Sequence, residues 1–189
     1  MVAHLVLEDG SVYAGEAFGA IDEIHGEVVF NTSMTGYQEV LTDPSYAGQI
    51  VILTYPLAGN YGIDPESVES RRIQVAALVV REHCLTPSHG SSIATLHQYL
   101  ASEGIPGISG IDTRAITRRL RTSGVMMGFI SAQTPEDALT SLTKLSRYDG
   151  TDFVSGVTTA ETYTWSQPHG DHPIGPRIVV ADCGLKYNI

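Results

Sequence analysis

The sequence predicts an α/β fold, and three observations lead to it. Short apolar runs bounded by Asp-Gly, Gly or Pro recur along the first 80 residues, as strands do. Segments with helical apolar spacing follow, and each begins at a residue that can cap a helix. The 189 residues, 42% hydrophobic and 17% charged, have an ordinary globular balance and suffice for one good-sized domain but not comfortably for two.

The predicted strands begin at the N-terminus. Residues 3–8 and 11–18 flank Asp9-Gly10, and this pair supplies the positive φ angles of a two-residue hairpin turn, so a strand–turn–strand unit is expected. Three further strands are predicted at 26–31, 49–55 and 73–80. The last two are nearly continuous apolar runs, which is typical of strands covered on both faces.

Three helices are predicted in the middle and later parts, over 92–104, 112–124 and 134–147. Each begins at a residue whose side-chain oxygen can accept a hydrogen bond from the first turn, namely Ser92, Asp112 and Thr134. A strand at 125–131 is expected between the last two helices.

The pattern changes after the third helix and divides the chain into 1–152, 153–176 and 177–189. Ser, Thr, His, Pro and Gly accumulate in 155–176, so this part is interpreted as a connector. A short buried-strand pattern then occupies 177–183, and only five residues follow Gly184. Since a parallel strand needs a crossover of a dozen or more residues, we expect the chain to stop at the beginning of a second domain.

Charge and hydropathy exclude several classes of function. Eleven Lys and Arg against 21 Asp and Glu give a net charge of −10, which weighs against nucleic acid as a partner. No apolar stretch approaches the ~20 residues that span a bilayer, and no signal peptide is evident, so a cytoplasmic protein without a membrane partner is expected. Cys84 and Cys183 can form one bridge at most.

The densest polar stretch covers residues 31–46. Its Asp43-Pro44-Ser45 segment can present the Ser45 hydroxyl to a small polar ligand. The alternative is a turn whose side chains bond to their own backbone, and local chemistry alone favours that alternative. A second loop, 59–62, lacks phosphate-loop spacing and is interpreted as a tight surface turn.

The helix from Asp112 carries a local excess of positive charge, four of the eleven basic residues. The four are Arg114, Arg118, Arg119 and Arg121, and helical spacing places Arg114, Arg118 and Arg121 on one face. This face can dock onto an acidic partner or neighbouring domain, or it can be solvated. Both interpretations stay open.

Nothing in the chain predicts a metal centre or a catalytic residue. His169 and His172 lie close together without a third ligand. Cys183 lacks a Gly-x-Cys-x-Gly turn, Cys84 has no identifiable base, and no triad emerges.

Several stretches resemble the small subunit of glutamine-dependent carbamoyl phosphate synthetase, in the family's order and over nearly the whole chain. They are LVLEDG (5–10), GEVVFNTSMTGYQE (26–39), LTDPSY (41–46), TYP with GN (54–56, 59–60) and IDTR with TR (111–114, 117–118). The long central run is far more specific than any short glycine motif.

The resemblance implies a layered β/β/α, swivelling-type N-terminal domain, followed at 177 by the first strand of a class I glutamine amidotransferase domain. In such a subunit that second domain hydrolyses glutamine, and the ammonia passes to a large subunit that makes carbamoyl phosphate from bicarbonate and ATP. The resemblance therefore implies L-glutamine and the large subunit as partners, with ATP and magnesium only on the large subunit and no cofactor in this chain.

The resemblance also assigns a role to Ser45. The family's serine in the Asp-Pro-Ser segment reaches across the domain boundary to bind glutamine, which reverses the local preference for a turn. The catalytic triad is absent, so the chain is expected to be an N-terminal fragment that is inactive alone. A stand-alone module that docks on a synthetase-like large subunit without chemistry is the alternative.

Overall fold

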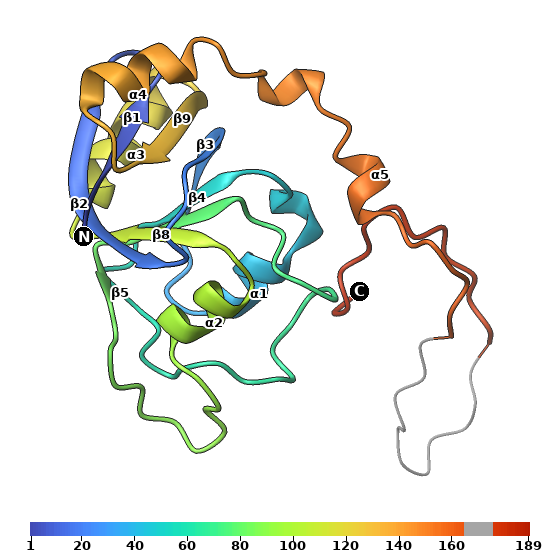
Figure 1. Ribbon diagram of the computed structural model, residues 1–189. Coiled ribbons are helices and arrows are strands. Elements are labelled where there is room, and N and C mark those ends of the chain that lie inside the picture. The colour runs from blue at the N-terminus through green and yellow to red at the C-terminus, as the bar shows by residue number, and fades with distance from the viewer. Residues whose placement is uncertain (165–175) are drawn as a thin grey trace.

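The computed structural model describes residues 1–164 and 176–189, and its centre is a closed seven-stranded barrel (Figure 1). In order around the barrel the strands are β1 Val2–Leu7, β2 Val12–Gly19, β8 Pro106–Ser109, β6 Ala77–Val79, β4 Ile50–Leu53, β3 Ile24–Asn31 and β9 Met126–Ser131. The consecutive pairs from β8 to β3 are parallel and the other pairs are antiparallel. The α/β class is confirmed, whereas the swivelling-type layering stays a prediction.

Shorter elements surround the barrel. A two-stranded parallel sheet pairs β5 Leu57–Ala58 with β7 Glu82–His83. The helices are α1 Tyr37–Thr42, α2 Leu96–Ser102, α3 Thr113–Ser123, α4 Pro135–Leu142 and α5 Val154–Val157, with single 3-10 turns η1 Pro44–Tyr46 and η2 Tyr148–Gly150. None of the helices in the described ranges is long and apolar enough to cross a membrane.

Strand alternation divides the apolar side chains into an inner and two outer clusters. The inner cluster fills the barrel with residues such as Leu5, Ile52 and Ile108, and α3 adds Ile116 and Leu120 to it. Outside the barrel, α1 and α2 cover one region, and α4 packs over β1 and β9 in another (Figure 1). Helices therefore cover separate outer faces of a filled barrel.

The N-terminal hairpin is confirmed, but its predicted turn is wrong. Of the two predicted turn residues, Asp9 and Gly10, only Gly10 has a positive φ, of 84°. The two-residue turn is therefore replaced by a longer one, in which the Leu7 amide donates to the Ser11 carbonyl. Asp9 instead accepts a hydrogen bond from the Ser11 amide at 2.9 Å and pairs with Arg119 at 2.6 Å. The backbone of Asp9 lies outside the left-handed region.

The predicted helix over 92–104 begins later than expected. Thr95 caps α2 through a reciprocal capping box with Gln98, with N–H···O distances of 3.1 and 2.9 Å. The residues before it turn instead toward Ile63, whose carbonyl accepts the Ile93 amide at 3.0 Å. Ile93 lies before the helix and is 70% exposed, so the predicted cap Ser92 is wrong.

Several elements were not predicted from the sequence, among them β8 and α1, besides the short β5, β7 and α5. The strand β8 contains Pro106 and Gly107, which usually indicate a turn. Gly107 is needed there because a Cβ would lie 2.6 Å from the Phe18 ring. The short helix α1 lies inside the polar stretch, for which the sequence predicts no helix.

The predicted strand at 177–183 is wrong in this structure. Residues 176–181 have no regular secondary structure, and Ile178, Val179 and Val180 are exposed. A buried strand needs hydrogen-bonding neighbours, and no described segment pairs with this one. The assignment of 1–152, 153–176 and 177–189 to a domain, a connector and a second domain is not tested and stays a prediction.

Candidate functional site

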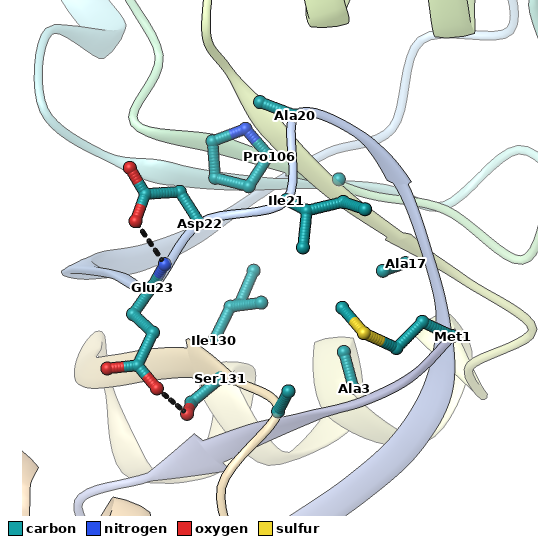
Figure 2. Close-up of a pocket in the computed structure, with 12 residues that line it drawn as sticks. Met1, Ala3, Ala17, Ala20, Ile21, Asp22, Glu23, Pro106, Ile130 and Ser131 are labelled. Atoms are coloured by element: carbon teal, nitrogen blue, oxygen red, sulfur yellow. Dashed lines mark hydrogen bonds between the residues drawn. The ribbon is translucent and has the colours of Figure 1, made fainter.

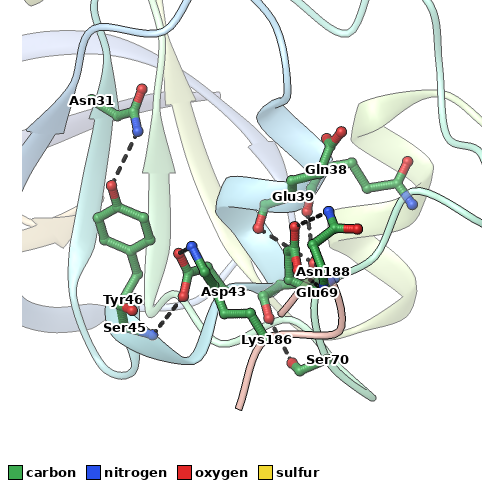
Figure 3. Close-up of polar contacts among 11 residues, drawn as sticks. Asn31, Gln38, Glu39, Asp43, Ser45, Tyr46, Glu69, Ser70, Lys186 and Asn188 are labelled. Atoms are coloured by element: carbon green, nitrogen blue, oxygen red, sulfur yellow. Dashed lines mark hydrogen bonds and ion pairs between the residues drawn. The ribbon is translucent and has the colours of Figure 1, made fainter. Parts of the chain in front are cut away.

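The polar stretch between β3 and β4 lies beside the C-terminal residues of the chain, where Lys186 reaches Asp43 (Figure 3). It begins at Asn31, whose Nδ2 donates to the Tyr46 hydroxyl at 3.0 Å and whose Oδ1 accepts from the Ser33 amide at 2.7 Å. The chain then turns through Gly36, with a φ of 82°, into α1. These contacts fix both ends of the stretch to one another.

Tyr61 supports the start of α1. Its hydroxyl accepts hydrogen bonds from the Gly36 and Tyr37 amides at 2.8 and 3.2 Å, and its ring stacks on Tyr37 with centroids 4.2 Å apart. Burial raises the pKa of both phenols above the ordinary value, and the neighbouring Glu39 carboxylate adds to the increase. The loop at 59–62, interpreted as a surface turn, therefore has a structural role that the sequence did not reveal.

Ser45 lies in the 3-10 turn η1, and three residues separate this turn from the start of β4. Asp43 accepts the Ser45 amide at 2.8 Å, and Pro44 occupies the first position of the turn. The turn is therefore satisfied through its backbone, as the alternative interpretation expected. The Ser45 side chain is exposed, and its hydroxyl makes no hydrogen bond to any described residue. The geometry leaves that hydroxyl available to a ligand.

The C-terminal segment 182–189 packs beside this turn. Lys186 Nζ lies 3.3 Å from Asp43 Oδ2, so one carboxylate holds both the Ser45 turn and the distant lysine. Gly184, with a φ of 111°, lies where a Cβ would be 3.4 Å from Pro44 and 2.8 Å from Val157. The contact between Asp43 and Lys186 was not predicted from the sequence, because residues 143 positions apart carry no local signal.

Glu69 makes the second contact to the same segment. Its carboxylate accepts the Asn188 amide at 3.1 Å and Asn188 Nδ2 at 2.5 Å, and its backbone carbonyl accepts the Tyr187 amide at 3.0 Å (Figure 3). Glu69 is 6% exposed. Glu69 is not among the residues predicted from the sequence.

The arginines of α3 lie on the exposed surface as the helical spacing predicts. Arg119 is paired with Asp9, whereas Arg114, Arg118 and Arg121 form no ion pair with any residue that the structure describes. The face defined by Arg114, Arg118 and Arg121 is therefore unneutralised within the described chain.

A separate pocket of about 160 Å³ opens beside β1, β2 and β9 (Figure 2). Its walls are mainly apolar, from residues such as Met1, Ile21 and Ile130. The one polar edge holds Glu23, whose Oε1 accepts the Ser131 hydroxyl at 2.6 Å. This pocket contains none of the predicted site residues.

The remaining candidates are scattered. Cys84 is half-buried, Cys183 is exposed, and both are free thiols. His169 and His172 lie outside the described residues. Within 1–164 and 176–189, no three His, Cys, Asp or Glu side chains gather as metal ligands do.

Comparison with known proteins identifies the family. The family described as "Carbamoyl-phosphate synthase small chain, CPSase domain" matches residues 5–130, the part that forms the barrel. The chain belongs to this family. The resemblance predicted from the polar stretch is thereby confirmed.

Three similar curated proteins each carry the name "Carbamoyl phosphate synthase small chain". The protein of Nitratidesulfovibrio vulgaris is 48% identical over 206 residues, which cover 100% of this chain and 54% of that protein. Those of Syntrophotalea carbinolica and a Nostoc species are 48% and 51% identical, again over 100% of this chain and over 53% and 52% of their own lengths. The chain thus spans about half the length of these family members. Among solved structures, an aminopeptidase from an Aneurinibacillus species matches with a TM-score of 0.38 and 16% sequence identity. The match covers 68% of this chain and 30% of the aminopeptidase chain, and it is too distant to inform function.

Proposed function

We propose that this chain is the N-terminal part of a glutamine-hydrolysing small chain that supplies ammonia to a large chain for carbamoyl phosphate synthesis. Family membership over residues 5–130 is one support. The observation that carries the proposal is the exposed Ser45 hydroxyl, in the turn whose Asp43 pairs with Lys186 of the C-terminal segment expected to begin the amidotransferase domain.

Ser45 contributes binding rather than bond cleavage in this proposal. A hydroxyl both donates and accepts a hydrogen bond, so it can contact the ammonium or carboxylate group of a bound amino acid. Asp43 orients the turn through the Ser45 amide, which leaves the hydroxyl free to face a ligand. The nucleophile and its base belong to the amidotransferase part of the complete protein, and the ATP and magnesium belong to the large chain.

Two measurements test this function. The gene is read beyond the codon for Ile189, and amidotransferase sequence is expected to follow. The complete gene product is then purified with its large chain, and glutamine-dependent carbamoyl phosphate formation is assayed. A stop codon directly after Ile189, or a complex that makes carbamoyl phosphate only from added ammonia, contradicts the proposal.

The unneutralised face formed by Arg114, Arg118 and Arg121 favours a second candidate function, docking onto an acidic surface of the large chain. Arginine pairs with carboxylates in a forked geometry and suits such a contact. We expect Arg118→Glu with Arg121→Glu to weaken association at low salt by tenfold or more, on the order of one lost interfacial charge pair. Lys144→Glu, an exposed charge elsewhere, is the control. Equal affinities for both variants contradict docking through this face.

A further inference from the structure

Three consecutive C-terminal residues are held by two acidic residues of the first domain. Lys186 reaches Asp43, while Tyr187 and Asn188 bind Glu69. These contacts join residues 119 positions apart in the case of Glu69 and Asn188. The C-terminal segment therefore contacts the first domain at Asp43 and Glu69, close in space to the turn that carries Ser45.

Glu69 is also anchored, on its other side, to the end of α1, which precedes the Ser45 turn in the chain. Its backbone amide donates to Thr42 Oγ1 at 2.8 Å, and that hydroxyl donates to the Gln38 carbonyl at 2.9 Å inside α1. The adjacent Ser70 hydroxyl donates to the Thr42 carbonyl at 2.6 Å. Thr42 directly precedes Asp43, so Glu69 connects the end of α1 with residues 187–188.

The burial of Glu69 is the physical argument for a specific role. Glu69 as a residue is only 6% exposed, and burying a carboxylate is costly unless its oxygens accept hydrogen bonds. Both oxygens do so, and both donors belong to Asn188. The nearby Glu66 is exposed, and its side chain makes no hydrogen bond to a described residue. Glu69 therefore binds the C-terminal segment through its side chain, whereas Glu66 does not.

We propose that Glu69 is a positioning residue that fixes residues 186–188 against the Ser45 turn, and thereby sets the distance between the Ser45 hydroxyl and glutamine bound by the following domain. This inference rests on the proposed function. Glu69 touches no substrate in it; it acts through Asn188 on one side and through Thr42 on the other.

The first test measures docking without any activity. In the complete gene product, Glu69→Ala is expected to increase amide hydrogen exchange in residues 184–189 about tenfold, because the Asn188 bonds are lost and the Tyr187 bond opens more often. Glu66→Ala is the matched control and should leave exchange unchanged. Unchanged exchange in Glu69→Ala overturns the proposal.

The second test measures glutamine use in the complex with the large chain. Glu69→Ala is expected to raise the KM for glutamine about tenfold with kcat within about twofold, since a binding group is displaced while the chemistry is not. In a Ser45→Ala background the same substitution should raise KM by less than about twofold, because Glu69 acts through Ser45. Independent, multiplicative effects indicate a merely structural role and overturn the proposal.

If Glu69→Ala does not fold, the side chains of Glu69 and Asn188 can instead exchange their roles as acceptor and donor, and this exchange tests the same contact. Asn188→Asp opposes two carboxylates and should raise KM as strongly, and Asn188 lies on the exposed end of the segment. Adding Glu69→Gln supplies an amide that donates to the new carboxylate and still accepts the backbone amide. The double variant should recover a KM within about twofold of the parent, and a failure to recover contradicts the pairing.

The outcomes separate this inference from the proposed function. A parent complex that hydrolyses no glutamine rejects both. A parent complex that is active, with an unchanged KM in Glu69→Ala, rejects the role of Glu69 alone.

Discussion

Two apolar runs of nearly the same composition have opposite environments in this protein. Ile50-Val51-Ile52-Leu53 forms β4 and is buried on both faces, whereas Ile178-Val179-Val180 is exposed, with Val179 at 90%. The difference lies in their neighbours. The strands β3 and β6 hydrogen-bond to both edges of β4, while no described segment pairs with 178–180. Apolar content predicts the preference of a segment for burial, and only a paired edge satisfies it.

The largest effect should come from removing volume in the run that is buried. Ile52 points into the barrel and is fully buried, so Ile52→Ala should reduce the free energy of unfolding by about 2–5 kcal/mol. Val179→Ala should change it by less than about 0.5 kcal/mol in the 189-residue chain. Urea unfolding measures both, and similar losses would mean that 178–180 is packed in solution.

Adding volume inside the barrel tests the same contrast from the other direction. Gly128 in β9 lies opposite Gly26, and a Cβ at Gly128 would overlap the Val28 side chain. Gly128→Ala should therefore cost about 1–3 kcal/mol of unfolding free energy. Gly150→Ala, where a Cβ meets open space, is the control and should stay within about 0.5 kcal/mol. A harmless Gly128→Ala would show that the barrel is less tightly packed than described.

Ser45 should separate binding from stability. Ser45→Ala removes an exposed hydroxyl, so the unfolding free energy should change by less than about 0.5 kcal/mol. The KM for glutamine of the complete complex should rise about tenfold, as for one lost hydrogen bond to a charged group. Ser33→Ala, an exposed serine of the same stretch, is the control. Equal KM values in the two variants remove Ser45 from the binding site.

The smallest expected effect is a pH dependence of the unfolding free energy, caused by His83. Burial, and then the charge of His97, lowers the pKa of His83, whose ring stacks on Phe18 with centroids 4.4 Å apart. Because the folded pKa lies below the ordinary 6.5, the contribution of His83 is present above pH 6.5 and is lost as the pH falls toward the folded pKa. Unfolding curves at pH 8 and pH 5.5 should show this loss, and it should shrink in His83→Gln. An equal loss in that variant assigns it to another group.

The sequence predicted most strands and two of the three helix caps. Asp112 and Thr134 accept hydrogen bonds from Ala115 and Asp137, as their positions imply. Those signals are local, since a cap and its partner lie three residues apart. The third cap was misplaced because the bridge between Ile63 and Ala94 draws the preceding residues away. Ser45 was selected through the family resemblance, since its local chemistry predicted a turn, and that turn is present as well.

The sequence by itself determined the α/β class, the family and the polar stretch that carries Ser45, because these depend on periodicity and on residues adjacent in the chain. Tertiary structure alone decided that the strands close into a barrel and that residues 177–183 join no sheet within the described part of the chain. It also decided that Asp43 and Glu69 hold residues 186–188 beside Ser45. The physical reason is that the hydrogen-bonding groups of a strand edge or a buried carboxylate are satisfied by partners that folding brings close. These partners lie far apart in the sequence, so local residue spacing does not predict them.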